Sequence, residues 1–124
     1  MITRNEVLMG RDKQFPLSDE QEVNLTKLLL ALNTFRKAYG KPMKVTSGYR
    51  PAAINAGVKG AAKKSAHIEC MACDFEDKDG LLDAFCLKNL NLLSDIGLYL
   101  ESPAHTPGWC HLDIRPRKST VFIP

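Results

Sequence analysis

The chain has 124 residues, 44% of them hydrophobic, and a formal net charge of +3 at pH 7. This length suits one small domain with a real core, so we expect residues 1–124 to form a single domain. No basic block is interleaved with aromatic residues, which argues against a nucleic-acid partner. Residues 1–6 carry no long apolar run, so we expect no signal peptide, no transmembrane segment and no membrane partner.

The first half of the chain predicts one long helix. Residues up to about Leu17 look irregular, and the helix then begins at Ser18, which forms a capping box with Gln21. Gly40 and Pro42 end it. Apolar residues recur on one face of this helix at helical spacing: Leu25, Leu28, Leu29, Leu32 and Phe35.

The second half predicts short strands and a second helix, and therefore an α+β fold with an antiparallel sheet flanked by helices. The expected strands cover 45–50, 71–75, 94–101 and 109–114, with a short segment at 121–123. The expected helices cover 51–55 and 81–90, and a flexible loop covers 57–64. A turn-rich loop, 102–108, would return the chain as an antiparallel hairpin.

Two histidines and an aspartate have the chemistry of a metal site. His67 and Asp74 are seven positions apart, and His111 follows near the C-terminus. Two imidazoles and a carboxylate are a three-ligand zinc set, and the open fourth position left for water is typical of a catalytic site. Alternation along the last long strand would place Trp109, His111 and Asp113 on one face.

A third segment, Ser47-Gly48-Tyr49-Arg50-Pro51, reads as a strand end followed by a turn. The guanidinium of Arg50 would stand at the strand end, where it is suited to bidentate capture of a carboxylate.

Together these motifs resemble the M15 peptidases. The resemblance rests on Ser-Gly-Tyr-Arg-Pro, then Asn55, then Ser65-x-His67 with Asp74, then Trp109-x-His111, and it spans residues 45–124. M15 peptidases are zinc-dependent D-Ala-D-Ala carboxypeptidases and peptidoglycan endopeptidases, including bacteriophage endolysins.

The resemblance implies an M15 (hedgehog/DD-peptidase-like) fold in which His67, Asp74 and His111 bind one Zn²⁺. It also implies that Arg50 and Ser65 contact peptidoglycan stem peptides. The C-terminal segment, residues 111–124, looks most like phage and prophage members. We therefore expect a monomer made in the host cytoplasm without a signal peptide, which acts at the bacterial cell wall.

The chain departs from the family at two positions. Cys70 stands where the family usually has glycine, which permits a tight turn that a cysteine strains. Gly108 stands three positions before the last histidine, where many members carry an acidic general base. The base must therefore come from elsewhere or be absent.

The predicted hairpin offers candidates for that base. If it closes, Glu101 lies near Trp109 and on the face of His111, which makes it the first choice for activating water. Asp113 is the second choice, although it could instead orient a metal ligand. His105 would stabilise an oxyanion, and Glu69 is a more distant candidate.

Two alternatives remain open. One is a zinc-binding module of the same fold that binds a wall fragment or a protein without catalysis. The other is a structural zinc site or redox pair built on Cys70-x-x-Cys73, although Cys86 and Cys110 provide no second close pair. Carboxypeptidase and endopeptidase action share this chemistry, so the bond that is cut also stays open.

Overall fold

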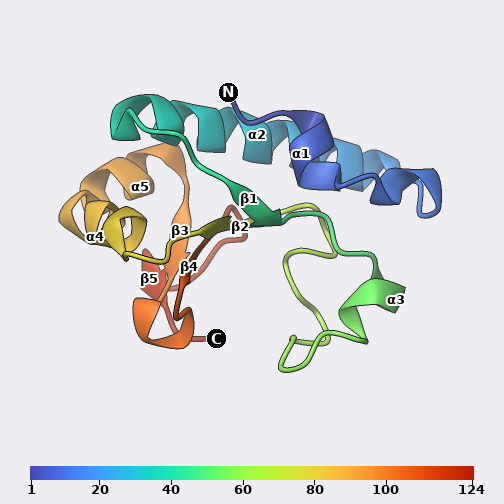
Figure 1. Ribbon diagram of the computed structural model, residues 1–124. Coiled ribbons are helices and arrows are strands. Elements are labelled where there is room, and N and C mark those ends of the chain that lie inside the picture. Colours follow the sequence, from blue (N-terminus) through green and yellow to red (C-terminus); the bar gives the residue numbers. More distant parts are fainter.

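The protein is built on a five-stranded sheet with the strand order β1-β2-β4-β3-β5. A computed structural model describes all residues, 1–124 (Figure 1). The strands are β1 (Val45–Ser47), β2 (Ala72–Glu76), β3 (Tyr99–Glu101), β4 (Trp109–Asp113) and β5 (Val121–Phe122). Neighbouring strands are antiparallel except β3 and β5, which are parallel. The predicted α+β class is confirmed, and the sheet differs from the expected one in this last pair.

Five helices and two 3-10 turns complete the chain. They are α1 (Arg4–Leu8), η1 (Arg11–Lys13), α2 (Asp19–Tyr39), α3 (Ala52–Asn55), α4 (Leu81–Lys88), α5 (Leu90–Ile96) and η2 (Pro103–His105). In Figure 1, α1 and α2 run along one side of the molecule, and α3 lies apart on the long connection between β1 and β2. No helix has the length and apolar character that a membrane crossing requires.

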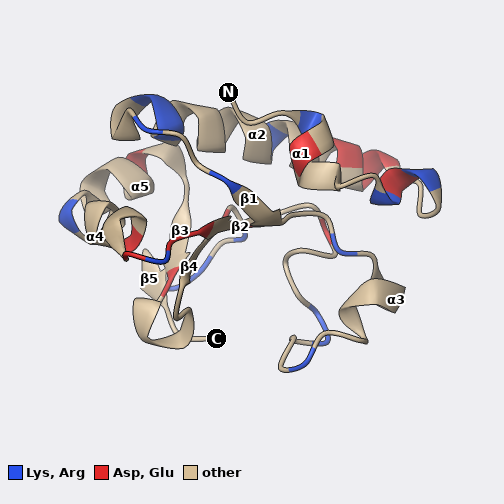
Figure 2. Cartoon of the chain, in the orientation of Figure 1, with Lys and Arg blue, Asp and Glu red and all other residues tan.

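The long helix α2 is as predicted. The Ser18 hydroxyl accepts a hydrogen bond from the Gln21 amide at 3.1 Å, and the Gln21 side chain accepts one from the Ser18 amide at 2.8 Å. Acidic residues gather in the first turn of α2 and basic ones in its last turn, as Figure 2 shows. This arrangement complements the helix dipole at both ends.

Two predictions of secondary structure are wrong. Residues 4–8 form α1, which begins with a capping box between Thr3 and Glu6, where an irregular segment was expected. Residues 90–96 form α5, which ends at Gly97 with φ of 93°, where the expected strand was to begin at residue 94. Leu93 of this helix is buried in the core. Gly97 adopts the left-handed conformation that ends the helix and leads the chain into the short strand β3.

The two faces of the sheet have different partners. Cys73 and Phe75 on β2, with Cys110 and Leu112 on β4, are fully buried in the core that the helices cover. The facing residues of α2 are also buried: Leu25, Leu28, Ala31, Leu32 and Phe35. Each fully buried large apolar side chain contributes about 1.5–3 kcal/mol to this packing. The alternate residues of β2 and β4 therefore point to the other face, which is free for polar chemistry.

The N-terminal segment supports the Ser-Gly-Tyr-Arg stretch. The Val7 carbonyl accepts a hydrogen bond from the Tyr49 amide at 2.8 Å, and Arg11 donates to the Tyr49 carbonyl at 2.8 Å. Gly48 packs so closely on α1 that a Cβ there would overlap the backbone of Val7. The backbone of residues 48–50 is thus held between α1 and the rest of the fold.

We predict that Gly48→Ala is strongly destabilising, because the new methyl group would collide with a backbone rather than with a movable side chain. The expected loss is at least about 2 kcal/mol in the free energy of unfolding, measured by urea denaturation. Gly57→Ala is the matched control, since a Cβ at Gly57 would meet only the Ile54 carbonyl at an ordinary 3.6 Å. Equal stability of the two variants would contradict the prediction.

Candidate metal site

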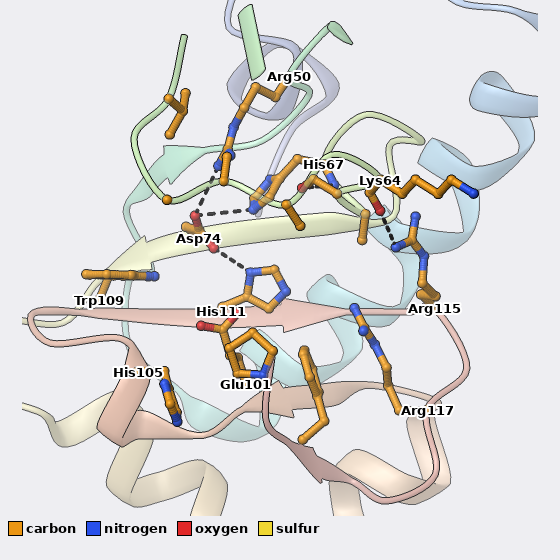
Figure 3. Close-up of a pocket in the computed structure, with 18 of the residues that line it drawn as sticks. Arg50, Lys64, His67, Asp74, Glu101, His105, Trp109, His111, Arg115 and Arg117 are labelled. Atoms are coloured by element: carbon orange, nitrogen blue, oxygen red, sulfur yellow. Dashed lines mark hydrogen bonds and ion pairs between the residues drawn. The ribbon is translucent and has the colours of Figure 1, made fainter. Parts of the chain in front are cut away.

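Three side chains predicted to bind metal converge on one point. His67, Asp74 and His111 each offer a ligand atom, and these atoms lie within 4.8 Å of one another (Figure 3). Asp74 on β2 is paired directly with His111 on β4. His67 comes from the turn that precedes β2. No other group of three or more histidine, cysteine, aspartate or glutamate side chains in the structure has this arrangement.

The ring of His67 is oriented by the backbone of Gly48. Its Nδ1 lies 2.9 Å from the Gly48 carbonyl oxygen, and its Nε2 lies 3.3 Å from Asp74 Oδ2. Because a carbonyl oxygen only accepts, Nδ1 carries the proton in this bond. In the neutral ring the lone pair of Nε2 is therefore directed at the centre of the site, which is the tautomer that a metal ligand needs, whereas a protonated Nε2 donates to Asp74.

The ring of His111 is held between two carboxylates. Its Nδ1 lies 2.8 Å from Asp74 Oδ1, and its Nε2 lies 2.8 Å from Asp113 Oδ2. Asp113 has no solvent exposure, and Arg117 donates to its Oδ2 at 2.7 Å. If a metal ion displaced the proton between Nδ1 and Asp74, donation from Nε2 to Asp113 would direct the Nδ1 lone pair at the metal. Both histidines thus have an outer partner that sets their orientation.

The charges of the site favour an ionised carboxylate. Burial alone would raise the pKa of Asp74, but hydrogen bonds from His111 and His67 outweigh it and lower the pKa. Burial disfavours the charged form of His111, but its bonds to Asp113 and Asp74 outweigh burial and raise its pKa to about 9. Asp74 also lies 3.7 Å from the guanidinium of Arg50.

This donor set fits a divalent ion such as zinc. An open zinc site typically has two imidazole nitrogens and one carboxylate oxygen as ligands, and the second nitrogen of each ring is hydrogen-bonded to an outer partner, as here. The four cysteines offer no competing site, since all are buried and unpaired and none belongs to the convergent group. Burial raises the pKa of Cys70 to about 12, which disfavours the thiolate that a metal would require.

The three ligands line a cleft of about 680 Å³. The same cleft is lined by four other residues predicted from the sequence: Arg50, Ser65, Glu101 and His105. The Ser65 hydroxyl accepts a hydrogen bond from the His67 amide at 3.2 Å. Asp113 and Glu69 do not line the cleft. Asp113 lies behind His111, where it can orient the ring. This position suits the second role considered for Asp113, orientation of a metal ligand, better than the role of general base.

Glu101 lies on the face of His111, as predicted, and lines the same cleft as Trp109. Tyr99 pairs with Asp113 and Leu100 with Leu112, so the continued register puts Glu101 opposite His111. Burial raises the pKa of Glu101. A half-buried carboxyl group directly across from His111 is well placed to exchange protons in the cleft.

Arg50 is firmly held in the wall of the cleft. It donates from Nη1 to Asn55 Oδ1 at 3.2 Å and from Nη2 to Ser47 Oγ at 3.3 Å. The side chain of Asn55 in turn donates to the Ala62 carbonyl at 2.8 Å, which ties the loop of residues 57–64 to α3. The contact with a substrate carboxylate expected for Arg50 stays a prediction.

Sequence reasoning missed a cationic part of the same cleft. Arg115, Arg117 and Lys64 line it, together with Phe122 from β5. Arg115 donates to the Lys64 carbonyl at 2.7 Å, which joins the C-terminal segment to the loop 57–64. The available signal was the pair of arginines two positions apart just after the strand of His111. Their placement depends on the parallel return of β5, which the sequence pattern does not reveal.

Comparison with protein-family models gives a match to Peptidase M15 over residues 2–105. The chain belongs to the M15 peptidase family. Members of this family are zinc-dependent, and the match covers His67, Asp74 and Glu101. It ends before His111, which the geometry adds to the site. Neither a curated protein nor a solved structure matches the chain.

The cysteine that replaces the family's usual glycine has a left-handed backbone. Cys70 has φ of 59° and lies in the turn between His67 and β2. This conformation costs a non-glycine residue roughly 1–2 kcal/mol. The strain expected at Cys70 is therefore present, and its fully buried side chain offsets part of it.

Metal binding should depend on pH through His111, because a metal ion must displace the proton from a ring whose pKa is about 9. The fraction of unprotonated rings rises about tenfold per unit of pH below that value. We predict that the apparent dissociation constant for Zn²⁺ falls about tenfold between about pH 7.5 and about pH 8.5 and levels off above about pH 9. Competition with a chelator of known protonation behaviour measures this, and a flat profile over this range would contradict it.

Proposed function

We propose that this M15 peptidase hydrolyses the stem peptides of bacterial peptidoglycan with a zinc ion held by His67, Asp74 and His111. The observation that carries the proposal is the meeting of this donor set with the carboxyl group of Glu101 in one cleft. The donor set supplies a metal site, and Glu101 supplies a group able to accept a proton.

Each residue has a distinct part in the reaction. A zinc ion at the three side chains supplies Lewis acidity that polarises the scissile carbonyl and lowers the pKa of a water molecule. Glu101 accepts a proton from the attacking water, whose oxygen bonds to the carbonyl carbon. Glu101 then returns the proton to the amine nitrogen as the C–N bond breaks. The raised pKa of Glu101 brings it closer to the working pH, which favours both transfers.

The other residues position the substrate and the ligands. Asp113 and the Gly48 carbonyl orient the two rings, and Arg50 holds Asp74. We assign Ser65 and Arg50 to contacts with the peptide and His105 to stabilisation of developing negative charge on the carbonyl oxygen. His105 lines the cleft beside Glu101, as Figure 3 shows.

The charge of the cleft supports an anionic substrate. Its walls include five cationic side chains, Arg50, Lys59, Lys64, Arg115 and Arg117, against two acidic ones, Asp74 and Glu101. Figure 2 shows basic residues along the connection between α3 and β2 that forms one wall. Peptidoglycan stems carry free carboxylates, so this positive potential would favour their encounter with the site. Both a carboxypeptidase and an endopeptidase of the wall fit these features.

The family resemblance of the C-terminal segment supports a phage or prophage origin. On this proposal the protein is an endolysin-type enzyme that acts as a monomer on the cell wall during lysis. A second candidate is a metal-binding module that holds a wall fragment without cutting it. The observation in its favour is Gly108, which occupies the position where many M15 members carry the general base.

Digestion of defined peptidoglycan tests the proposal. The zinc-loaded protein should release fragments that mass spectrometry detects, and a chelator should abolish them. Glu101→Gln should lower the rate at least about 100-fold, because it removes the proton acceptor, while one equivalent of zinc stays bound. Glu20→Gln is the matched control, since Glu20 is exposed in the first turn of α2, and it should keep the full rate.

The outcomes separate the two candidates. Absence of any product from protein that carries one equivalent of zinc would overturn the enzyme and favour the binding module. Full activity of Glu101→Gln would show that the base is another group.

A further inference from the structure

Arg117 is an arginine of the cleft with hydrogen-bonding capacity left over. It follows β4, lines the cleft beside His111, and approaches it from the opposite side to Glu101 and His105 (Figure 3). Its Nη2 donates to Asp113 Oδ2 at 2.7 Å, whereas its Nη1 donates to no protein acceptor. The side chain is 24% exposed.

The other two arginines of the cleft differ from Arg117 in how they are held. Arg50 uses both terminal nitrogens on Asn55 and Ser47 and is only 9% exposed. Arg115 donates to the carbonyl of Lys64. Arg115 makes no ion pair and stacks on no aromatic ring, whereas Arg117 does both and still keeps a free donor.

The guanidinium of Arg117 is also fixed in place before any ligand arrives. The guanidinium carbon Cζ lies 3.9 Å from the centroid of the Phe122 ring, and Nη2 is bound to the carboxylate of Asp113. The parallel pairing of β5 with β3 is what brings Phe122 beneath it. A planar guanidinium group that is already held by two contacts loses little conformational entropy when it binds a carboxylate, and its paired N–H groups match the two oxygens of that anion.

We propose that Arg117 is a specificity-determining residue that binds a free carboxylate of the substrate peptide close to the bond that is cut. This rests on the proposed peptidase function, whose substrate carries two such groups. One is the C-terminal carboxylate of the stem, and the other is the α-carboxylate that a γ-linked D-glutamate leaves free. Arg115 and Lys64 on the same part of the wall strengthen the local positive potential.

The test uses four versions of one peptide, L-Ala-γ-D-Glu-L-Lys-D-Ala-D-Ala. Either carboxylate, both or neither is converted to the amide. Calorimetry measures the binding of each to the zinc-loaded Glu101→Gln protein, so that the readout needs no turnover. With Arg117 present, amidation of one carboxylate should weaken binding about 10-fold or more, the worth of a charge-assisted hydrogen-bonded pair. The position whose amidation has this effect identifies the carboxylate.

Variants then show whether Arg117 is the cause. In Arg117→Gln the peptides that differ only at that carboxylate should bind equally, and Arg117→Lys should restore part of the difference by keeping the charge. Lys118→Gln is the control, because it removes the same charge from an exposed neighbour outside the cleft. Arg117→Lys also serves as the informative variant if Arg117→Gln does not fold.

The contrary results are equally specific. Discrimination at that carboxylate that survives in Arg117→Gln, or the absence of any discrimination with Arg117 present, would overturn the proposal. A structural role through Asp113 alone would weaken all four peptides equally and reduce zinc affinity, which also overturns it. Discrimination by a protein that cleaves no peptidoglycan would sustain the Arg117 site and refute only the peptidase.

Discussion

The register between β2 and β4 is the constraint on which the whole site depends. It pairs Asp74 with His111 and, on the alternate positions, places Phe75 beside Cys110. A slip of one residue would turn Asp74 toward the core and expose Phe75, because side chains alternate along a strand. Burial of the apolar residues on one face of the sheet therefore fixes the register, and the register brings Asp74 and His111 together on the opposite face.

The site is also a continuous chain of charges. Arg117, Asp113, His111, Asp74 and Arg50 follow one another through contacts of 2.7 to 3.7 Å. Asp113 has no solvent exposure, and its Oδ2 lies within hydrogen-bond distance of both His111 and Arg117, which offsets the cost of burying a polar side chain. Removal of one member leaves a buried partner unsatisfied, which commonly costs more than the contact itself contributed. This coupling makes ligand orientation and stability hard to separate by mutation.

Much of the fold and the metal set could be predicted because their signals are local. The α2 helix has a capping box and apolar periodicity, and β4 alternates clearly between polar and apolar residues. The convergence of His67, Asp74 and His111 could be predicted from their chemistry and their setting in recognisable motifs. The residue directly opposite Glu101 could not be predicted, because the loop between β3 and β4 conceals how the two strands align.

What sequence reasoning missed depends on contacts between distant segments or on very short elements. The helix α1 has only five residues, so its stability comes from packing against Gly48 and Tyr49 rather than from propensity. Arg117 enters the cleft because β5 returns parallel to β3 and places Phe122 beneath it. Nothing in the spacing of residues 115–122 indicates that pairing.

X-ray absorption spectroscopy at the zinc edge of the zinc-loaded protein tests the central claim, the identity of the metal ligands. The geometry predicts a first shell of nitrogen and oxygen atoms at about 2.0–2.2 Å with an imidazole signature, lost in His67→Ala and retained in Cys70→Ser. Sulfur scattering at about 2.3 Å, or a first shell unchanged by His67→Ala, would contradict it.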